Sequence, residues 1–146
     1  MMVLPLCLGL VKSKGEANIL NLTNYNLGDR YIIALAAGLK KAKNIERCLL
    51  GANRITDLGL GELAKAIGTE IVSLDLSNNK ITQIDQRLLD MIVESEYKLE
   101  EINLSNNLLK LTSSESLLRS SKYSKHLLKL NLCKNKLNSS CSDALA

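Results

Sequence analysis

The chain has 146 residues, a formal net charge of +4, 46% hydrophobic residues and 23% charged residues. This length suits one domain with a sizeable core, and this composition excludes a disordered or collagen-like chain. Aromatic residues make up only 3% of the chain, whereas it contains 31 Leu and 14 Asn. A core of Leu and Ile with so many Asn residues indicates a repeated unit.

The first segment, residues 1–16, is apolar from Met1 to Val11. That run is about half the ~20 residues needed by a membrane-spanning helix. We interpret it as an apolar cover over the open end of the domain. A secretory signal is the alternative, but no positively charged stretch precedes the run. We therefore expect a cytoplasmic protein with reduced cysteines.

Five segments fit the pattern L-x-x-L-x-L-x-x-N-x-L, and their starts differ by 28, 26, 28 and 28 residues. They divide the chain into repeats at 17–44, 45–70, 71–98, 99–126 and an incomplete 127–146. Within each segment, apolar and polar residues alternate, which predicts a short strand with one inward face. We expect one parallel sheet, with strands centred on Leu20, Leu49, Asp75, Asn103 and Asn131.

An asparagine follows four of the five predicted strands, at Asn53, Asn79, Asn107 and Asn135. Its side chain can both donate to and accept from backbone groups at a tight turn. We therefore predict a structural ladder of buried asparagines. The first repeat departs from it, with Tyr25 at this position.

The second half of each repeat predicts a helix, because apolar residues recur at i, i+3, i+4 and i+7. The expected inward stripes are Ile32, Leu35, Ala36 and Leu39, then Leu60, Leu63, Ala64 and Ile67, then Leu88, Leu89, Ile92 and Val93. Asp29 and Asp57 are expected to cap the first two helices. The Ser-rich fourth helix, with Leu117 and Leu118, is expected to be the loosest, and a fifth would be cut short at 142–146.

The segments Gly28-Asp29 and Thr56-Asp57-Leu58-Gly59, each followed by Leu-Ala at helical spacing, resemble the ribonuclease-inhibitor-like class of leucine-rich repeat proteins. The resemblance covers residues 17–146. It implies an α/β solenoid with the parallel sheet on the concave side and helices on the convex side. It also implies binding of another protein across the concave face.

The predicted partner-binding residues lie beside the inward strand residues, and they are polar and of mixed sign. They are Asn21, Arg47, Leu49, Ser73, Asp75, Glu101, Asn103, Lys129 and Asn131. No nucleophile is paired with a base, since the single His126 stands alone, and no cysteine spacing suits a metal. A metal or acid–base site at Glu100 and Glu101 is disfavoured, because adjacent strand residues face opposite sides. We expect no catalytic activity, cofactor or metal.

The sequence thus predicts a protein-interaction module. The alternative is a regulator of a small GTPase, because Ran GTPase-activating proteins share this repeat class, with Arg47 as the nearest concave arginine. Residues 110–146 carry a surplus of Lys and Arg that could attract an acidic protein, anionic lipid or RNA. Tyr123 is the one aromatic residue there that could stack on a base, so nucleic acid is not the expected partner, and neither is a membrane. Self-association through the uncapped end is a further alternative.

Overall fold

The computed structural model describes residues 18–42 and 44–136. Five strands form one parallel sheet in the order β1-β2-β3-β4-β5. The strands are β1 (Ile19–Asn21), β2 (Arg47–Leu49), β3 (Ser73–Asp75), β4 (Glu101–Asn103) and β5 (Lys129–Asn131). The helices are α1 (Asp29–Leu39), α2 (Asp57–Ala64), α3 (Gln86–Val93) and α4 (Leu111–Ser121).

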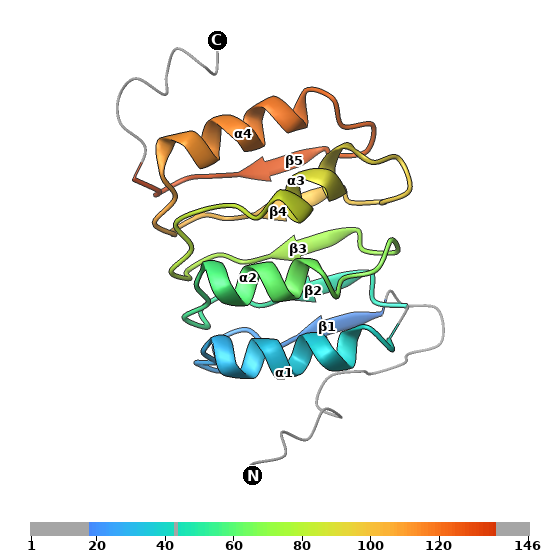
Figure 1. Ribbon diagram of the computed structural model, residues 1–146, viewed down its shortest axis with the longest axis vertical. Coiled ribbons are helices and arrows are strands. Elements are labelled where there is room, and N and C mark those ends of the chain that lie inside the picture. The colour runs from blue at the N-terminus through green and yellow to red at the C-terminus, as the bar shows by residue number, and fades with distance from the viewer. Residues whose placement is uncertain (1–17, 43, 137–146) are drawn as a thin grey trace.

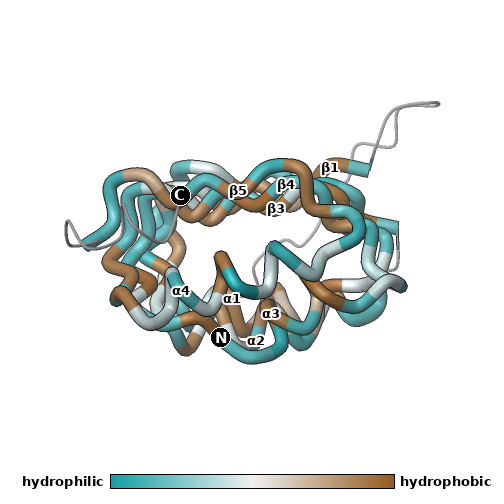
Figure 2. The backbone as a smooth tube through the Cα atoms, turned by 90° about the horizontal axis from the view of Figure 1, so that it is seen from above, coloured by the Kyte–Doolittle hydropathy of each residue, from teal (hydrophilic) through white to brown (hydrophobic). Residues whose placement is uncertain are grey.

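The strands and helices form two layers, and each helix follows its strand along the stack (Figure 1). Seen from above, the sheet lies on one side and the helices on the other, which leaves the second face of the sheet open (Figure 2). The predicted α/β architecture with a single parallel sheet is confirmed. The predictions for residues 1–16, for Ala17 and Leu137, and for a helix at 142–146 lie outside the described residues.

The strand centres differ from the prediction in four of the five cases. The middle residues are Leu20, Cys48, Leu74, Ile102 and Leu130, one position earlier than expected after β1. Four of these side chains are buried against the helices, and Leu130 at the end of the sheet is partly buried. The last residue of β3, β4 and β5 bonds the backbone N–H two residues later with its side chain. Leu49 at the end of β2 has no such bond, and β2 ends at the same register position.

The asparagine ladder is confirmed by the hydrogen bonds of its members. Asn53, Asn79 and Asn107 are buried, at 0%, 7% and 4% exposure. The Nδ2 of Asn79 donates to the carbonyls of Leu50 and Leu76, and its Oδ1 accepts from the backbone of the preceding turn. Each asparagine therefore joins its own turn to the neighbouring one, which pairs backbone groups that the bend would otherwise leave buried and unpaired.

Two of the three predicted helix stripes need correction. The first stripe is buried as predicted, but Ile67 lies beyond the end of α2 and is only partly buried. In α3 the buried residues are Leu88, Met91 and Ile92, while Leu89 is only partly buried and Val93 is 41% exposed. The connection from β3 to α3 is longer than those from β1 to α1 and from β2 to α2, so α3 is placed differently in its repeat and Met91 faces the core.

The fourth helix buries serines beside its leucine. In α4, Ser113 and Ser114 are buried together with Leu117. The hydroxyl of Ser114 donates to the carbonyl of Lys110 at 3.4 Å, which pairs that polar group inside the stack. The expected looseness of this helix stays a prediction.

Asp29 and Asp57 do not cap their own helices. Gly28 begins α1 without a side-chain cap, and Thr56 caps α2 through its hydroxyl. Each aspartate instead accepts from a threonine of the following turn: Asp29 from the backbone and hydroxyl of Thr56, and Asp57 from those of Thr82. The carboxylates therefore connect successive units rather than complete one helix.

Gly59 and Gly61 both lie inside α2. A Cβ at Gly59 would collide with a carboxylate oxygen of Asp29 and lie 3.0 Å from Cγ2 of Ile55. The absence of a side chain at Gly59 thus lets α2 approach the Asp29 carboxylate.

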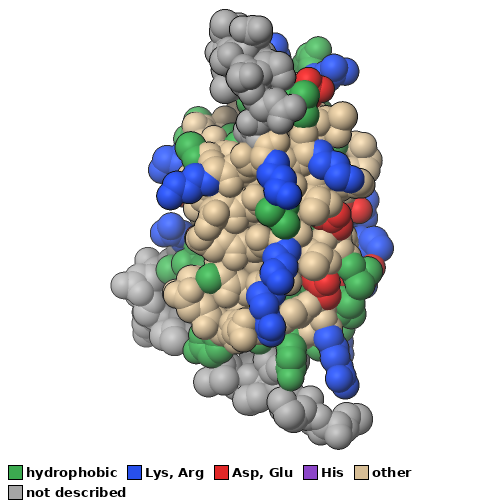
Figure 3. Space-filling model, turned by 90° about the vertical axis from the view of Figure 1, so that its left-hand side faces the viewer, with side chains coloured by type: hydrophobic (Ala, Val, Ile, Leu, Met, Phe, Trp, Pro, Cys, Tyr) green, Lys and Arg blue, Asp and Glu red, His purple; other side chains and the backbone are tan. Residues whose placement is uncertain are grey.

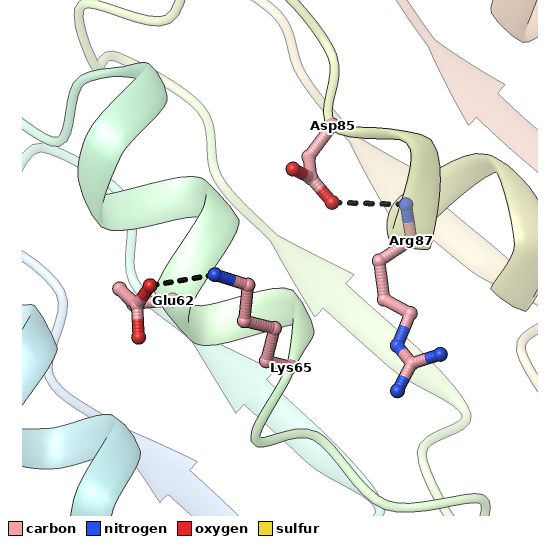
Figure 4. A network of polar contacts seen from close by, with 4 residues as sticks. All are labelled: Glu62, Lys65, Asp85 and Arg87. Atoms are coloured by element: carbon pink, nitrogen blue, oxygen red, sulfur yellow. Dashed lines mark hydrogen bonds and ion pairs between the residues drawn. The ribbon is translucent and has the colours of Figure 1, made fainter.

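Charged side chains lie on the helix layer at α2 and α3 (Figure 4). Glu62 and Lys65 form an ion pair of 2.8 Å, and the carboxylate of Asp85 accepts from the backbone of Arg87 at 2.9 Å. Asp85 is the N-cap of α3, so this bond pairs one of the free N–H groups at the start of that helix. Both contacts are exposed, and each joins residues within or next to a single helix.

Candidate functional site

The candidate site is the open face of the sheet, where the strand residues that flank the buried ones point away from the helices. A hollow of about 220 Å³ crosses this face from β2 to β5. Ten residues line it: Arg47, Leu49, Ser73, Leu74, Asp75, Glu101, Ile102, Asn103, Lys129 and Asn131. The structure therefore brings together eight of the nine residues singled out from the sequence, and Asn21 on β1 lies outside the lining.

One row across the hollow carries alternating charge. Arg47, Ser73, Glu101 and Lys129 are successive register partners on β2 to β5. The Nζ of Lys129 lies 3.1 Å from Oε1 of Glu101, and the hydroxyl of Ser73 lies 3.5 Å from Oε2.

The carboxylate of Glu101 is held ionised by this row. The hydrogen bond and charge of Lys129 hold the pKa of Glu101 below its usual range, and Arg47 and Ser73 add to that effect. The row thus presents a fixed negative charge between two cations at neutral pH.

The second row is built from side chains that turn the chain at the end of each strand. An oxygen of Asn21, Asp75, Asn103 and Asn131 accepts from the backbone N–H two residues later, at 2.9–3.1 Å. These bonds fix the side chains on the open face. Among the described residues, Nδ2 of Asn103 and of Asn131 has no hydrogen-bond acceptor, so two amide donors face solvent on neighbouring strands.

Leu49 interrupts this second row with a partly buried apolar side chain. Gly51, two residues later, is packed closely by the next strand: a Cβ there would lie 3.1 Å from the hydroxyl of Ser77 and 3.6 Å from a carboxylate oxygen of Asp75. The alternation along the strands predicted which residues lie on the open face, but it did not predict the side-chain bonds at the strand ends. The sequence signal for those bonds is an Asn or Asp followed two residues later by Ser, Thr or Cys.

The cysteines and the histidine supply no reactive arrangement on this face within the described ranges. Cys48 is buried, and burial raises the pKa of its thiol to about 12, which leaves it protonated. Cys133 is exposed at the end of β5, and His126 is exposed in the loop before β5. Residues 18–42 and 44–136 contain no cluster of three or more side chains able to hold a metal ion.

None of the helices in the described part of the chain combines the length and apolar character required to cross a membrane.

No family model matches the chain, whereas a curated protein and a solved structure are similar to it. The FERM domain-containing protein C of Dictyostelium discoideum is 27% identical over 93 residues. The match covers 62% of this chain and spans about 6% of the length of that relative. The solved structure of Leiomodin-1 Actin-Binding Site 2 aligns with a TM-score of 0.67 at 19% identity, and the alignment covers 90% of this chain and 77% of that one. This structural likeness shows that the chain shares the fold of that domain.

Proposed function

We propose that the chain is a leucine-rich repeat module of the ribonuclease-inhibitor-like class, and that it binds another protein across the open face of its sheet. In this proposal the sheet lines the concave side of a short solenoid and the helices form its convex side. The hollow across four strands, lined by fixed polar side chains, is the observation that carries it. The regular offset of 26 or 28 residues between register partners supports the repeat assignment.

The chemistry of the hollow favours a macromolecule over a small-molecule substrate. Small-molecule pockets are deep and mostly apolar, with few polar groups. Here seven of the ten lining residues are charged or polar, and the other three are Leu49, Leu74 and Ile102. Polar, partly solvated surfaces of this kind are typical of protein–protein contacts. We accordingly propose no catalytic activity.

The alternating charges define what a partner must offer. Glu101 requires a donor or cation, whereas Arg47 and Asn131 require acceptors. Because such complementarity acts mainly through specificity and association rate, removal of the charges should weaken binding without unfolding the domain.

A paired set of variants tests the proposal. Arg47→Ala and Lys129→Ala remove exposed cations from the open face. Lys98→Ala and Arg87→Ala are matched controls, since Lys98 forms a comparable ion pair with Glu70, 2.7 Å long, outside the hollow. All four variants should keep the parent's melting temperature within a few degrees.

The first probe is actin, because the solved structure that shares this fold is named as an actin-binding site. Filament co-sedimentation and cross-linked capture from cell extract are compared across the four variants. Loss of a captured partner from the Arg47→Ala and Lys129→Ala proteins, with retention by both controls, supports binding at the open face. Equal capture by all four proteins contradicts it. A GTPase whose hydrolysis accelerates in the presence of the parent, and not of Arg47→Ala, would instead favour the GTPase-regulator alternative.

A further inference from the structure

A second charged surface lies along the edge of the molecule where the strands end and the loops turn toward the helices; we call it the strand-exit edge. This edge faces the reader in Figure 3, where basic side chains run along its length. Five exposed cations belong to the loops that form it: Arg54, Lys80, Lys110, Lys134 and Lys136.

The turn geometry places these cations at repeated positions. The fifth residues after β1 to β5 are Asn26, Arg54, Lys80, Leu108 and Lys136. The third residue after every strand has a left-handed φ of 54–64°, so the five turns share one shape. With neighbouring strands ~4.8 Å apart, the row from Arg54 to Lys136 spans about 14 Å.

The cations of this edge are uncompensated by direct pairing. None of the five forms an ion pair with an acidic residue of the described ranges. Lys110 acts at longer range on Asp57, and the guanidinium of Arg54 donates to the carbonyl of Asn26 at 2.9 Å. The red carboxylates of this view lie toward the helix layer, so the side toward the open face is basic (Figure 3).

The basic C-terminal quarter of the sequence is therefore not one surface. Lys110, Lys134 and Lys136 lie on the strand-exit edge, joined there by Arg54 and Lys80 from earlier repeats. Lys122 and Lys125 follow the end of α4, at the opposite edge of the molecule (Figure 1).

An apolar side chain interrupts the row of cations. Leu108 is 38% exposed and takes the position between Lys80 and Lys136. Its backbone N–H is bonded to the carbonyl of Ile81 at 2.9 Å, which fixes the turn that presents it. A phosphate backbone gains nothing from an aliphatic group there, and the row holds no aromatic ring on which a base could stack. A protein segment that combines carboxylates with an apolar residue satisfies both features.

We infer that the strand-exit edge binds an acidic protein segment of about four or five extended residues, with an apolar side chain seated at Leu108 and carboxylates at the flanking lysines. The length follows from the span of the row and from the ~3.3 Å rise per extended residue. This surface is separate from the open face and goes beyond the function proposed for that face.

The test uses the whole chain and fluorescence anisotropy of labelled probes. The main probe is a short peptide of glutamates around one leucine. The other probes are the same peptide with the leucine replaced by serine, a single-stranded oligothymidine, and phosphatidylserine-containing vesicles. The double variant Lys80→Glu with Lys136→Glu alters the edge. Lys122→Glu with Lys125→Glu is the matched control, because it changes the net charge equally at exposed positions.

We expect the Lys80→Glu, Lys136→Glu protein to bind the leucine peptide about tenfold more weakly at low salt, and added salt to weaken the parent's binding. We expect the matched control to stay close to the parent. Leu108→Ser should weaken binding of the leucine peptide but not of the serine peptide.

Three results would overturn the inference. Equal weakening of leucine-peptide binding in the matched control would show that binding depends on the net charge of the protein and not on the strand-exit edge. Tighter binding of oligothymidine or vesicles than of the leucine peptide, insensitive to Leu108→Ser, would assign the edge to a polyanion or a lipid surface. No binding of the leucine peptide by the folded parent, verified by circular dichroism, would remove the site. Arg47→Ala serves to separate the two surfaces, because it should leave peptide binding at the edge unchanged.

Discussion

Replacement of Asn79 by Leu is the sharpest perturbation of the fold, because this side chain makes five hydrogen bonds within the stack. Its Oδ1 accepts from the N–H groups of Asn53 at 3.0 Å and Ile55 at 2.8 Å. Its Nδ2 donates to the carbonyls of Leu50, Leu76 and Ser77 at 3.0–3.1 Å. Leu has similar bulk and no polar atoms, so Asn79→Leu removes all five bonds.

The loss of stability in Asn79→Leu comes from the two backbone N–H groups that lose their acceptor, because the three carbonyls keep other hydrogen-bond donors. Leu50 O also accepts from Asn53 Nδ2, Leu76 O from Asn107 Nδ2, and Ser77 O from the N–H of Ala52. The N–H groups bonded to Asn79 Oδ1 lose their partner inside the core. A buried unpaired donor costs about 1–3 kcal/mol, so two donors give a loss of about 2–6 kcal/mol in the free energy of unfolding.

Asn135 provides the matched control at the end of the ladder. It is partly buried, and its Oδ1 accepts from the backbone N–H of Leu109 at 3.1 Å. Water can replace that bond at a partly exposed position, so Asn135→Leu should cost about 1 kcal/mol or less. Urea unfolding followed by far-ultraviolet circular dichroism measures both variants, and an unchanged m-value would show that the same surface unfolds.

Equal stability of the Asn79→Leu and Asn135→Leu proteins would refute this reasoning. It would mean that the buried N–H groups find other partners or reach water, and that the ladder is not what holds neighbouring turns together. A parent-like midpoint for Asn79→Leu would lead to the same conclusion.

Three further changes test separate contacts. Gly59→Ala should destabilise the protein by about 1–3 kcal/mol, because the new Cβ meets the Asp29 carboxylate, whereas Gly68→Ala, with nothing within 4 Å, should be near neutral in the same urea titration. Ala52→Asn should raise the melting temperature, with a gain of about 0.5–1 kcal/mol, since Ala52 has a φ of 57° that Asn adopts more readily; a lower melting temperature would contradict the strain. Burial would raise the pKa of Asp57, but the hydrogen bonds from the next turn outweigh burial and lower the pKa. The ionised Asp57 carboxylate therefore adds to the free energy of unfolding above the unfolded-state pKa of about 3.9, and this stabilisation is lost as pH falls through the folded-state pKa. Asp57→Asn should therefore flatten the acid side of the stability–pH curve, and an unchanged slope would exclude this carboxylate as a contributor.

Local sequence pattern determined the order of the elements and the buried side of the strands and of α1, but not the buried stripe of α3. Leu20 and Leu74 alternate with polar neighbours, and Leu35 and Leu39 recur at helical spacing, so the inward residues could be predicted without a structure. The ladder that includes Asn79 was predictable for the same reason, since asparagine at a tight turn bonds nearby backbone. The eight open-face residues followed directly, because the neighbours of an inward strand residue point outward.

Contacts between units were decided only by the tertiary structure. Asp29 could cap its own helix or bond the next turn, and only the stacking distance brings Thr56 close enough to select the second option. The strand-exit edge likewise joins Lys80 to Lys136, which are far apart in sequence, and separates Lys136 from Lys122, which is near. The physical reason is that periodicity fixes which way a side chain points within its own unit, whereas the partners it meets depend on how closely and in what register the units stack.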